Sequence, residues 1–123
     1  MAKLMAGLVC AILLFVSVLT IQAAGVEYIV GDSEGWTAGQ DYNAWAEGKE
    51  FHRGDVLVFS YAEGYGVDEV TAEKLEECDN TAAIFSDHSG ETYIPLSTAG
   101  DHYFIGGPFR MCPDGMNMTI TVH

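Results

Sequence analysis

Positive charge is scarce in this chain. Its 123 residues include five Lys and Arg against 18 Asp and Glu, a formal net charge of −13 at pH 7. Nucleic acids and anionic membrane surfaces bind clusters of Lys and Arg. The composition therefore excludes nucleic acid as a partner and disfavours anionic membranes. Two interpretations of the negative charge stay open, a solvated exterior or an acidic face that docks a basic extracellular protein.

Recognisable catalytic motifs are also lacking. The serines beyond the N-terminal region stand in no nucleophile motif, and the acidic residues are spread along expected turns and one helix. No carboxylate pair can be placed across a cleft, as glycoside hydrolysis would need. There is no internal repeat and no low-complexity segment. We therefore expect that the chain is not an enzyme.

The one long apolar run lies at the N-terminus. Lys3 precedes it, it ends at Ile21, and small residues follow in Gln22–Gly25. This order predicts a secretory signal peptide over residues 1–24, cleaved after Ala23, Ala24 or Gly25, and one domain over 25–123. An uncleaved anchor is the alternative, because the run is nearly long enough to span a bilayer. We expect secretion to the extracellular space without stable membrane insertion.

Cysteine is sparse, with three residues in the chain. Cys10 lies in the expected signal peptide, which leaves Cys78 and Cys112 in a secreted domain. In an oxidising compartment this pair indicates one disulfide rather than a metal or redox pair. Closing a loop of about 35 residues stabilises a fold by roughly 3.5–4 kcal/mol in the chain-entropy model.

Short strands separated by turns dominate the rest of the sequence. Residues 56–61 are apolar on both faces, as in a strand in the middle of a sandwich. Residues 92–96 contain Pro95, which restricts them to an edge or bulged strand. One two-turn helix is expected over 71–78, capped by Thr71. The pattern predicts an all-β sandwich or barrel with one short helix, its other strands at 26–30, 67–70, 103–105 and 117–122.

The segment from Tyr103 to Met116 resembles the ligand loop of the phytocyanins, the plant branch of the blue-copper cupredoxins. That loop reads Tyr-Phe-Ile-Cys-Gly, three residues, His-Cys, two residues, Gly-Met, and it aligns here without a gap. The motifs Tyr28–Asp32, Asp41–Ala46 and Gly54–Phe59 follow the phytocyanin order and spacing too. The resemblance covers about 26–122 and implies a Greek-key cupredoxin sandwich. It also implies that Cys78 and Cys112 pair.

The resemblance places the copper ligands at four positions, three of which carry another residue. Gly106 stands at the cysteine, Met111 at one histidine and Tyr65 at the other, and only Met116, the axial thioether, matches. A blue-copper site needs two imidazoles and a thiolate around the metal. We therefore expect no cofactor and no redox activity, as in the early nodulin-like branch of the family. The alternative is an electron-transfer protein that binds copper through atypical ligands.

Four histidines could in principle rebuild a metal site: His52, His88, His102 and His123. Their spacing matches no zinc pattern, and the resemblance places none of them where the ligands converge. We interpret all four as surface residues. Trp36 and Trp45 are expected in the core, although Trp36 could instead line an exposed groove.

The vestigial site permits two interpretations. Tyr65, Phe109 and Met111 could form an apolar patch for a small hydrophobic ligand or a sugar, such as a cell-wall polysaccharide. The other interpretation is that Tyr65 and Met111 fill the former copper position as packing residues.

Asn117-Met118-Thr119 is a glycosylation sequon on an expected outward-facing strand position, either used or unused. We expect a monomer. The chain stops at His123 without the Pro/Ser-rich tail and hydrophobic end of a lipid-anchored protein, and a missing terminal segment would give the same ending.

Overall fold

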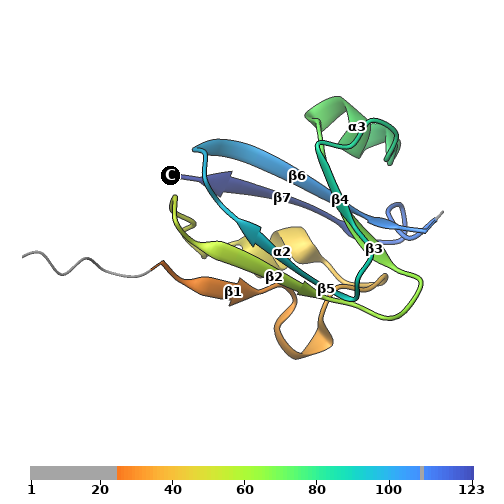
Figure 1. Cartoon of the computed structure of the whole chain (residues 1–123), viewed down its shortest axis with the longest axis horizontal. Helices are drawn as coiled ribbons and strands as arrows, with labels where there is room; N and C mark the ends of the chain where they lie inside the picture. The colour runs from red at the N-terminus through yellow and green to blue at the C-terminus, as the bar shows by residue number, and fades with distance from the viewer. Residues whose placement is uncertain (1–24, 109) are drawn as a thin grey trace, which may run out of the picture.

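Two β-sheets pack face to face to form the domain (Figure 1). The computed structural model describes residues 25–108 and 110–123. One sheet has the order β1-β2-β5, with β1 parallel to β2 and β5 antiparallel. The other has the order β4-β3-β6-β7 and is antiparallel throughout. The strands are β1 (Glu27–Ile29), β2 (Val56–Ser60), β3 (Gly66–Val70), β4 (Phe85–Asp87), β5 (Glu91–Pro95), β6 (Gly100–Gly107) and β7 (Asn117–Val122). The expected sandwich is confirmed.

The main core lies between the sheets. Alternate residues of a strand point to opposite faces, so Leu57 and Phe59 of β2 meet Phe104 of β6 from the opposite sheet. Trp36 and Tyr42 also belong to this core. The Trp36 ring lies edge-on to Phe59 at a centroid distance of 5.1 Å. Trp36 is 1% exposed, which confirms the expected core position. A smaller cluster under α3 contains Val70, Ile105 and Cys112.

The helices differ from the expectation in number. The expected helix is present as α3 (Ala72–Glu77), with the Thr71 hydroxyl accepting a hydrogen bond from the Lys74 amide at 3.4 Å. A second helix, α2 (Tyr42–Ala46), was not expected, so the prediction of one short helix is wrong. The Asp41 carboxylate caps α2 by accepting from the Ala44 amide at 3.0 Å. A 3-10 turn, η1 (Asp32–Glu34), follows β1.

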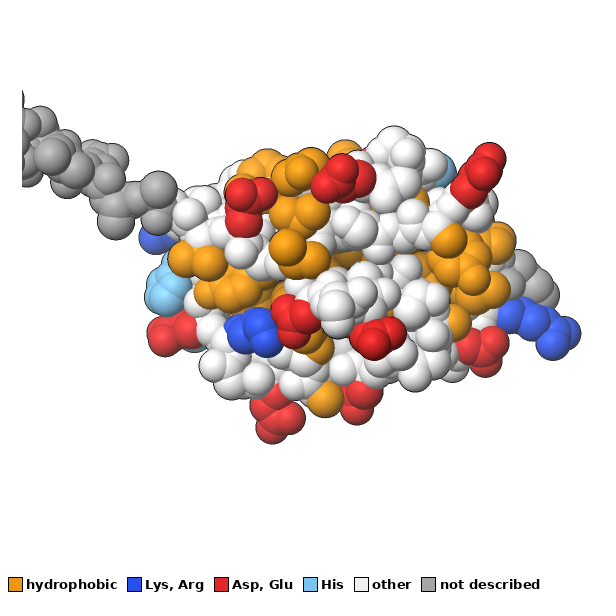
Figure 2. Space-filling model, turned by 90° about the horizontal axis from the view of Figure 1, so that it is seen from below, with side chains coloured by type: hydrophobic (Ala, Val, Ile, Leu, Met, Phe, Trp, Pro, Cys, Tyr) orange, Lys and Arg blue, Asp and Glu red, His pale blue; other side chains and the backbone are white. Residues whose placement is uncertain are grey.

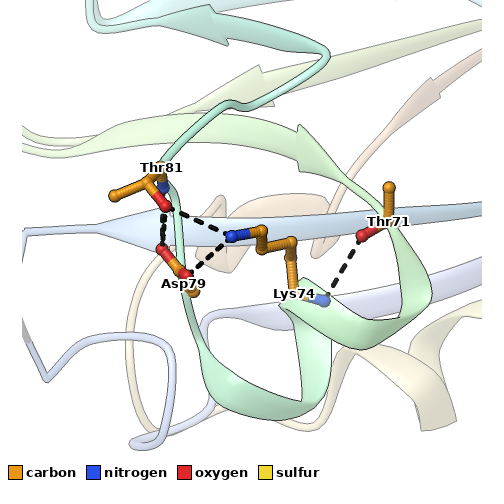
Figure 3. Close-up of polar contacts among 4 residues, drawn as sticks. All are labelled: Thr71, Lys74, Asp79 and Thr81. Carbon is orange, nitrogen blue, oxygen red and sulfur yellow. Dashed lines mark hydrogen bonds and ion pairs between the residues drawn. The ribbon is translucent and has the colours of Figure 1, made fainter.

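Polar contacts fasten the end of α3 to the loop that follows it (Figure 3). The Lys74 ammonium lies 2.8 Å from Asp79 and 3.3 Å from the Thr81 hydroxyl. Thr81 donates to Asp79 through both its amide and its hydroxyl. The hydrogen bond from Lys74, followed by those from Thr81, lowers the pKa of Asp79 well below its usual range. The contacts join residues on either side of Cys78 in the sequence.

Strand β5 forms an edge of its sheet, as Pro95 requires. Pro95 lies opposite Val56 at the end of the β2–β5 ladder. Among residues 25–108 and 110–123, no helix has the length and apolar character needed to cross a membrane. The expected signal peptide, residues 1–24, lies outside the described residues.

Candidate functional site

The four positions assigned to copper ligands lie at one end of the sandwich. Tyr65 precedes β3 directly, and Val67 pairs with Gly106 in the β3–β6 ladder. The Gly106 amide donates to the Met116 carbonyl at 2.7 Å, and the Met116 amide donates to the Met111 carbonyl at 2.9 Å. Met116 is fully buried, and the half-buried Tyr65 and Met111 pack against the same core cluster. The fold therefore brings these four residues together.

Met116 fills the space beside Gly106. A β-carbon placed on Gly106 would lie 2.5 Å from Cε, 2.7 Å from Cβ and 3.0 Å from Sδ of Met116. Real β-carbons do not approach other heavy atoms this closely, so a side chain at position 106 requires Met116 to move. Gly106 is buried and does not have a positive φ. Close packing, rather than backbone conformation, is what favours glycine here.

The loop after β6 is fixed at several points. A disulfide joins Cys112 to Cys78 at the end of α3, with an S–S distance of 2.01 Å. The expected pairing is confirmed. Asn117 Nδ2 donates to the Cys112 carbonyl at 2.7 Å. The Gly39 amide donates to the Asp114 carbonyl at 2.7 Å. Residues 110–116 are thus held against α3, β7 and the segment before α2.

Trp36 supports the site strand from within the core. Its indole N–H donates to the Gly66 carbonyl at 3.1 Å. Gly66 pairs with Gly107 in the neighbouring strand, so the indole fixes the backbone beside Tyr65 and Gly106. Trp45 is half-buried, with the Lys49 ammonium 4.4 Å from its ring centroid. The expected core position holds for Trp36 and in part for Trp45.

The histidines occupy two kinds of environment. His88 is exposed, and its ring lies where a side chain on Gly66 would point. Neighbouring positions of a strand face opposite sides. Because Gly66 pairs with Gly107 and Met116 lies against Gly106, His88 is on the opposite side of the sheet from the thioether. His88 therefore does not join the four positions.

His102 corrects the expectation that all four histidines are surface residues. Its side chain is 15% exposed, and its Nδ1 lies 2.7 Å from Glu69 Oε1. Its Nε2 lies 2.9 Å from the Thr98 carbonyl. Burial disfavours the charged ring, but the hydrogen bonds to Glu69 and Thr98 outweigh it and raise the pKa of His102. No local pattern indicates this pair, because its members are 33 residues apart in the chain.

The donor atoms at the four positions do not fit a blue-copper ion. Gly106 offers none, Tyr65 offers a phenol, and Met111 and Met116 offer thioethers. Imidazole nitrogen and thiolate sulfur, which the site needs, are both missing from these positions. In the part of the chain that the structure describes, no group of three or more His, Cys, Asp or Glu side chains could hold a metal.

The expected ligand patch is described only in part. Phe109 lies outside the described residues, whereas Tyr65 and Met111 pack against the core. A cavity of about 570 Å³ opens nearby, between α3 and the loop, and its lining includes Glu77, His88 and Pro113. Tyr65, Met111 and Met116 are not among its lining residues. The patch of Tyr65, Phe109 and Met111 stays a prediction.

Comparison with known proteins places this arrangement in a family. Residues 36–116 match the model of the plastocyanin-like domain. The chain belongs to the plastocyanin-like, or phytocyanin, family. A blue copper protein of Pisum sativum is 40% identical over 117 residues, covering 94% of this chain and 62% of that protein. Early nodulin-like protein 3 of Arabidopsis thaliana is 33% identical over 101 residues, covering 80% of this chain and 51% of the relative.

A solved structure gives the same fold. Cucumber basic protein, a blue copper protein, superposes with a TM-score of 0.72 at 31% identity, over 80% of this chain and all of that one. The phytocyanin domain is therefore shared in full with that structure. The chain spans only about half to two thirds of the length of the pea and Arabidopsis relatives.

Proposed function

We propose that this phytocyanin is a secreted, copper-free protein that serves as a binding or structural module in the plant extracellular space. It carries out neither electron transfer nor enzymatic catalysis. The observation that carries the proposal is the relation of Gly106 to Met116. The position that would supply the thiolate has no side chain, and the remaining thioether occupies the adjacent space.

The chemistry of the other two positions supports the same conclusion. A phenol at Tyr65 and a thioether at Met111 replace the two imidazoles of a blue-copper site, and thioethers are soft, weak ligands for Cu(II). Both side chains pack against the core cluster that contains Met116, which favours a packing role. The similarity to early nodulin-like protein 3 is compatible with a member of the family that has another task.

The remaining expectations complete the proposal. A signal peptide over 1–24 directs the chain to the apoplast, and the protein is a monomer. An N-glycan is attached at Asn117, where the hydrogen bond to Cys112 uses one of the two Nδ2 hydrogens. The partner is a cell-wall polysaccharide or a basic extracellular protein. The excess of negative charge supports the basic protein, because removing Lys3 with the leader leaves four basic against 18 acidic residues. Mass spectrometry of the secreted chain, before and after glycosidase, checks the cleavage and the glycan, and light scattering checks the monomer.

Copper titration of the secreted protein tests the central claim. Cucumber basic protein serves as the positive control. We expect no intense copper–thiolate absorption and no stoichiometric tight binding by calorimetry. A second function, electron transfer through atypical copper ligands, is favoured by the 40% identity to the pea blue copper protein. One tightly held equivalent of copper with an intense visible band would establish that alternative and overturn the proposal.

A further inference from the structure

The outer face of the sheet β1-β2-β5 carries a row of three apolar residues, and the two at its ends are exposed. The register aligns Ile29 with Val58 and Val58 with Tyr93, one residue from each strand. Since alternate residues share a face and Leu57 and Phe59 point into the core, this row points away from it. Ile29 is 53% and Tyr93 is 56% exposed, whereas Val58 between them is 5% exposed. Large apolar side chains in such a row mark interaction surfaces more often than isolated ones do.

Carboxylates flank the row on both sides. Glu27 of β1 lies in the row that contains Val56, and Glu91 of β5 lies opposite Ser60 in the row beyond Tyr93. A shallow pocket of about 190 Å³ is lined by Glu27, Ile29, Val58, Ser60, Glu91 and Tyr93. The view from below, toward this sheet, shows hydrophobic side chains in the open between acidic ones (Figure 2). The lining contains no basic residue.

The two carboxylates are not neutralised by the rest of the described chain. No ion pair involves Glu27 or Glu91 among residues 25–108 and 110–123. The Tyr93 hydroxyl donates to Glu91 Oε1 at 3.0 Å. This hydrogen bond, and the negative charges of Glu91 and Glu27, raise the pKa of Tyr93. An aromatic ring between two unpaired carboxylates has a negative face and negative neighbours, an arrangement that attracts cations.

We propose that this face binds a basic polypeptide segment, with a Lys or Arg side chain over the Tyr93 ring and its charge between Glu27 and Glu91. Apolar residues of the same segment cover Ile29, which is the exposed aliphatic residue of the row. A second copy of this chain fits poorly, because a symmetric contact would bring like charges together. The face lies on the sheet that does not contain Gly106, so the inference is independent of whether the loop end binds copper.

An NMR titration tests this inference. The probe is an acetylated and amidated alternating Lys-Val peptide, added to the ¹⁵N-labelled secreted protein, and the comparison ligands are an alternating Glu-Val peptide and cellohexaose. We expect amide shifts confined to β1, β2 and β5 with the Lys-Val peptide alone. Binding should weaken several-fold between about 10 mM and about 150 mM salt, because the contact is charged and exposed.

Paired variants separate local recognition from net charge. Glu27→Gln with Glu91→Gln should weaken binding of the Lys-Val peptide about tenfold. Tyr93→Thr should also weaken binding of this peptide about tenfold, because it removes the ring while keeping a residue that favours strands. The control, Glu73→Gln with Glu76→Gln, removes the same charge from exposed positions on α3 and should change binding less than about twofold. Equal weakening by both charge pairs, shifts outside this sheet, or tighter binding of cellohexaose at these amides would each overturn the inference.

Discussion

Met116 and position 106 compete for one volume at the end of the sandwich. The terminal methyl of Met116 lies 2.5 Å from where a β-carbon on Gly106 would stand, and its β-carbon lies 2.7 Å away. The methyl group could rotate aside. The β-carbon cannot, because it is bonded to the Met116 backbone, whose carbonyl accepts a hydrogen bond from the Gly106 amide. Any side chain at 106 therefore requires a backbone shift as well as a new rotamer.

This competition predicts the effect of Gly106→Ala. Replacing a strand glycine by alanine would stabilise by about 0.5–1 kcal/mol if the site were open. The overlap with Met116 should reverse the sign and destabilise the domain by about 1–3 kcal/mol. Urea unfolding of a double-mutant cycle with Met116→Ala measures the coupling. We expect Gly106→Ala to cost clearly less in the Met116→Ala background, and equal costs in both backgrounds would refute the packing argument.

Introducing the missing copper-ligating side chains should create copper binding. The triple variant Tyr65→His, Gly106→Cys, Met111→His, with Met116 retained, supplies two imidazoles, a thiolate and an axial thioether. The new side chain at 106 requires Met116 and its backbone to shift, so this variant should be less stable than the parent protein. Because the fold brings these positions together, we still expect stoichiometric Cu(II) binding with intense visible absorption. The matched control replaces Gly106 by Ser instead of Cys and should stay colourless. A colourless triple variant that is folded, with the Cys78–Cys112 bridge verified by mass spectrometry, would show that these positions no longer converge.

The sequence predicts those parts of the fold that are encoded locally. The run at 56–61, apolar on both faces, indicated β2, and Pro95 correctly marked an edge strand. Helix α2 was missed because a segment of five residues is too short to establish a helical period. Strand β4 was missed because its three residues carry no clear alternation. The overlap of Met116 with position 106 is tertiary, since it depends on the backbone separation of β6 and the loop rather than on residue type.

Removal of the disulfide should destabilise the domain without changing its fold. Cys78 and Cys112 are separated by 34 positions, and a loop of this length contributes about 3.5–4 kcal/mol in the chain-entropy model. Cys78→Ala with Cys112→Ala should lower the free energy of unfolding by about that amount. Chemical denaturation measures it, and near-UV circular dichroism of the aromatic side chains reports whether native packing survives. A loss below about 1 kcal/mol would mean that the reduced chain is constrained by other contacts.

The ion pair between Glu69 and His102 should make stability depend on pH. The pKa of His102 is raised above its ordinary value of 6.5, since the contacts with Glu69 and Thr98 outweigh burial. Its contribution is therefore fully present below pH 6.5 and is lost as the pH rises through the raised, folded-state pKa. For a partly exposed pair we expect a loss of about 0.5–1 kcal/mol. His102→Gln should remove this part of the pH dependence, whereas His52→Gln, at an exposed site, should not. An NMR titration that places the His102 pKa below 6.5 would contradict the assignment.

The hydroxyl of Tyr42 organises the turn that leads from Trp36 to α2. It donates to the Gly35 carbonyl at 2.6 Å and accepts from the Thr37 amide at 2.7 Å, while its ring is 1% exposed against Trp36. Tyr42→Phe keeps the ring packing but leaves a donor and an acceptor without this partner, which should cost about 1–3 kcal/mol. Tyr93→Phe is the matched control, because its hydroxyl is exposed, and it should cost less than about 0.5 kcal/mol. Amide exchange should speed up at Thr37 in the first variant. If both variants lose equally little stability, water replaces the Tyr42 hydroxyl and the backbone hydrogen bonds of Trp36 to Ser60 and of Gly39 to Asp114 suffice to hold the turn.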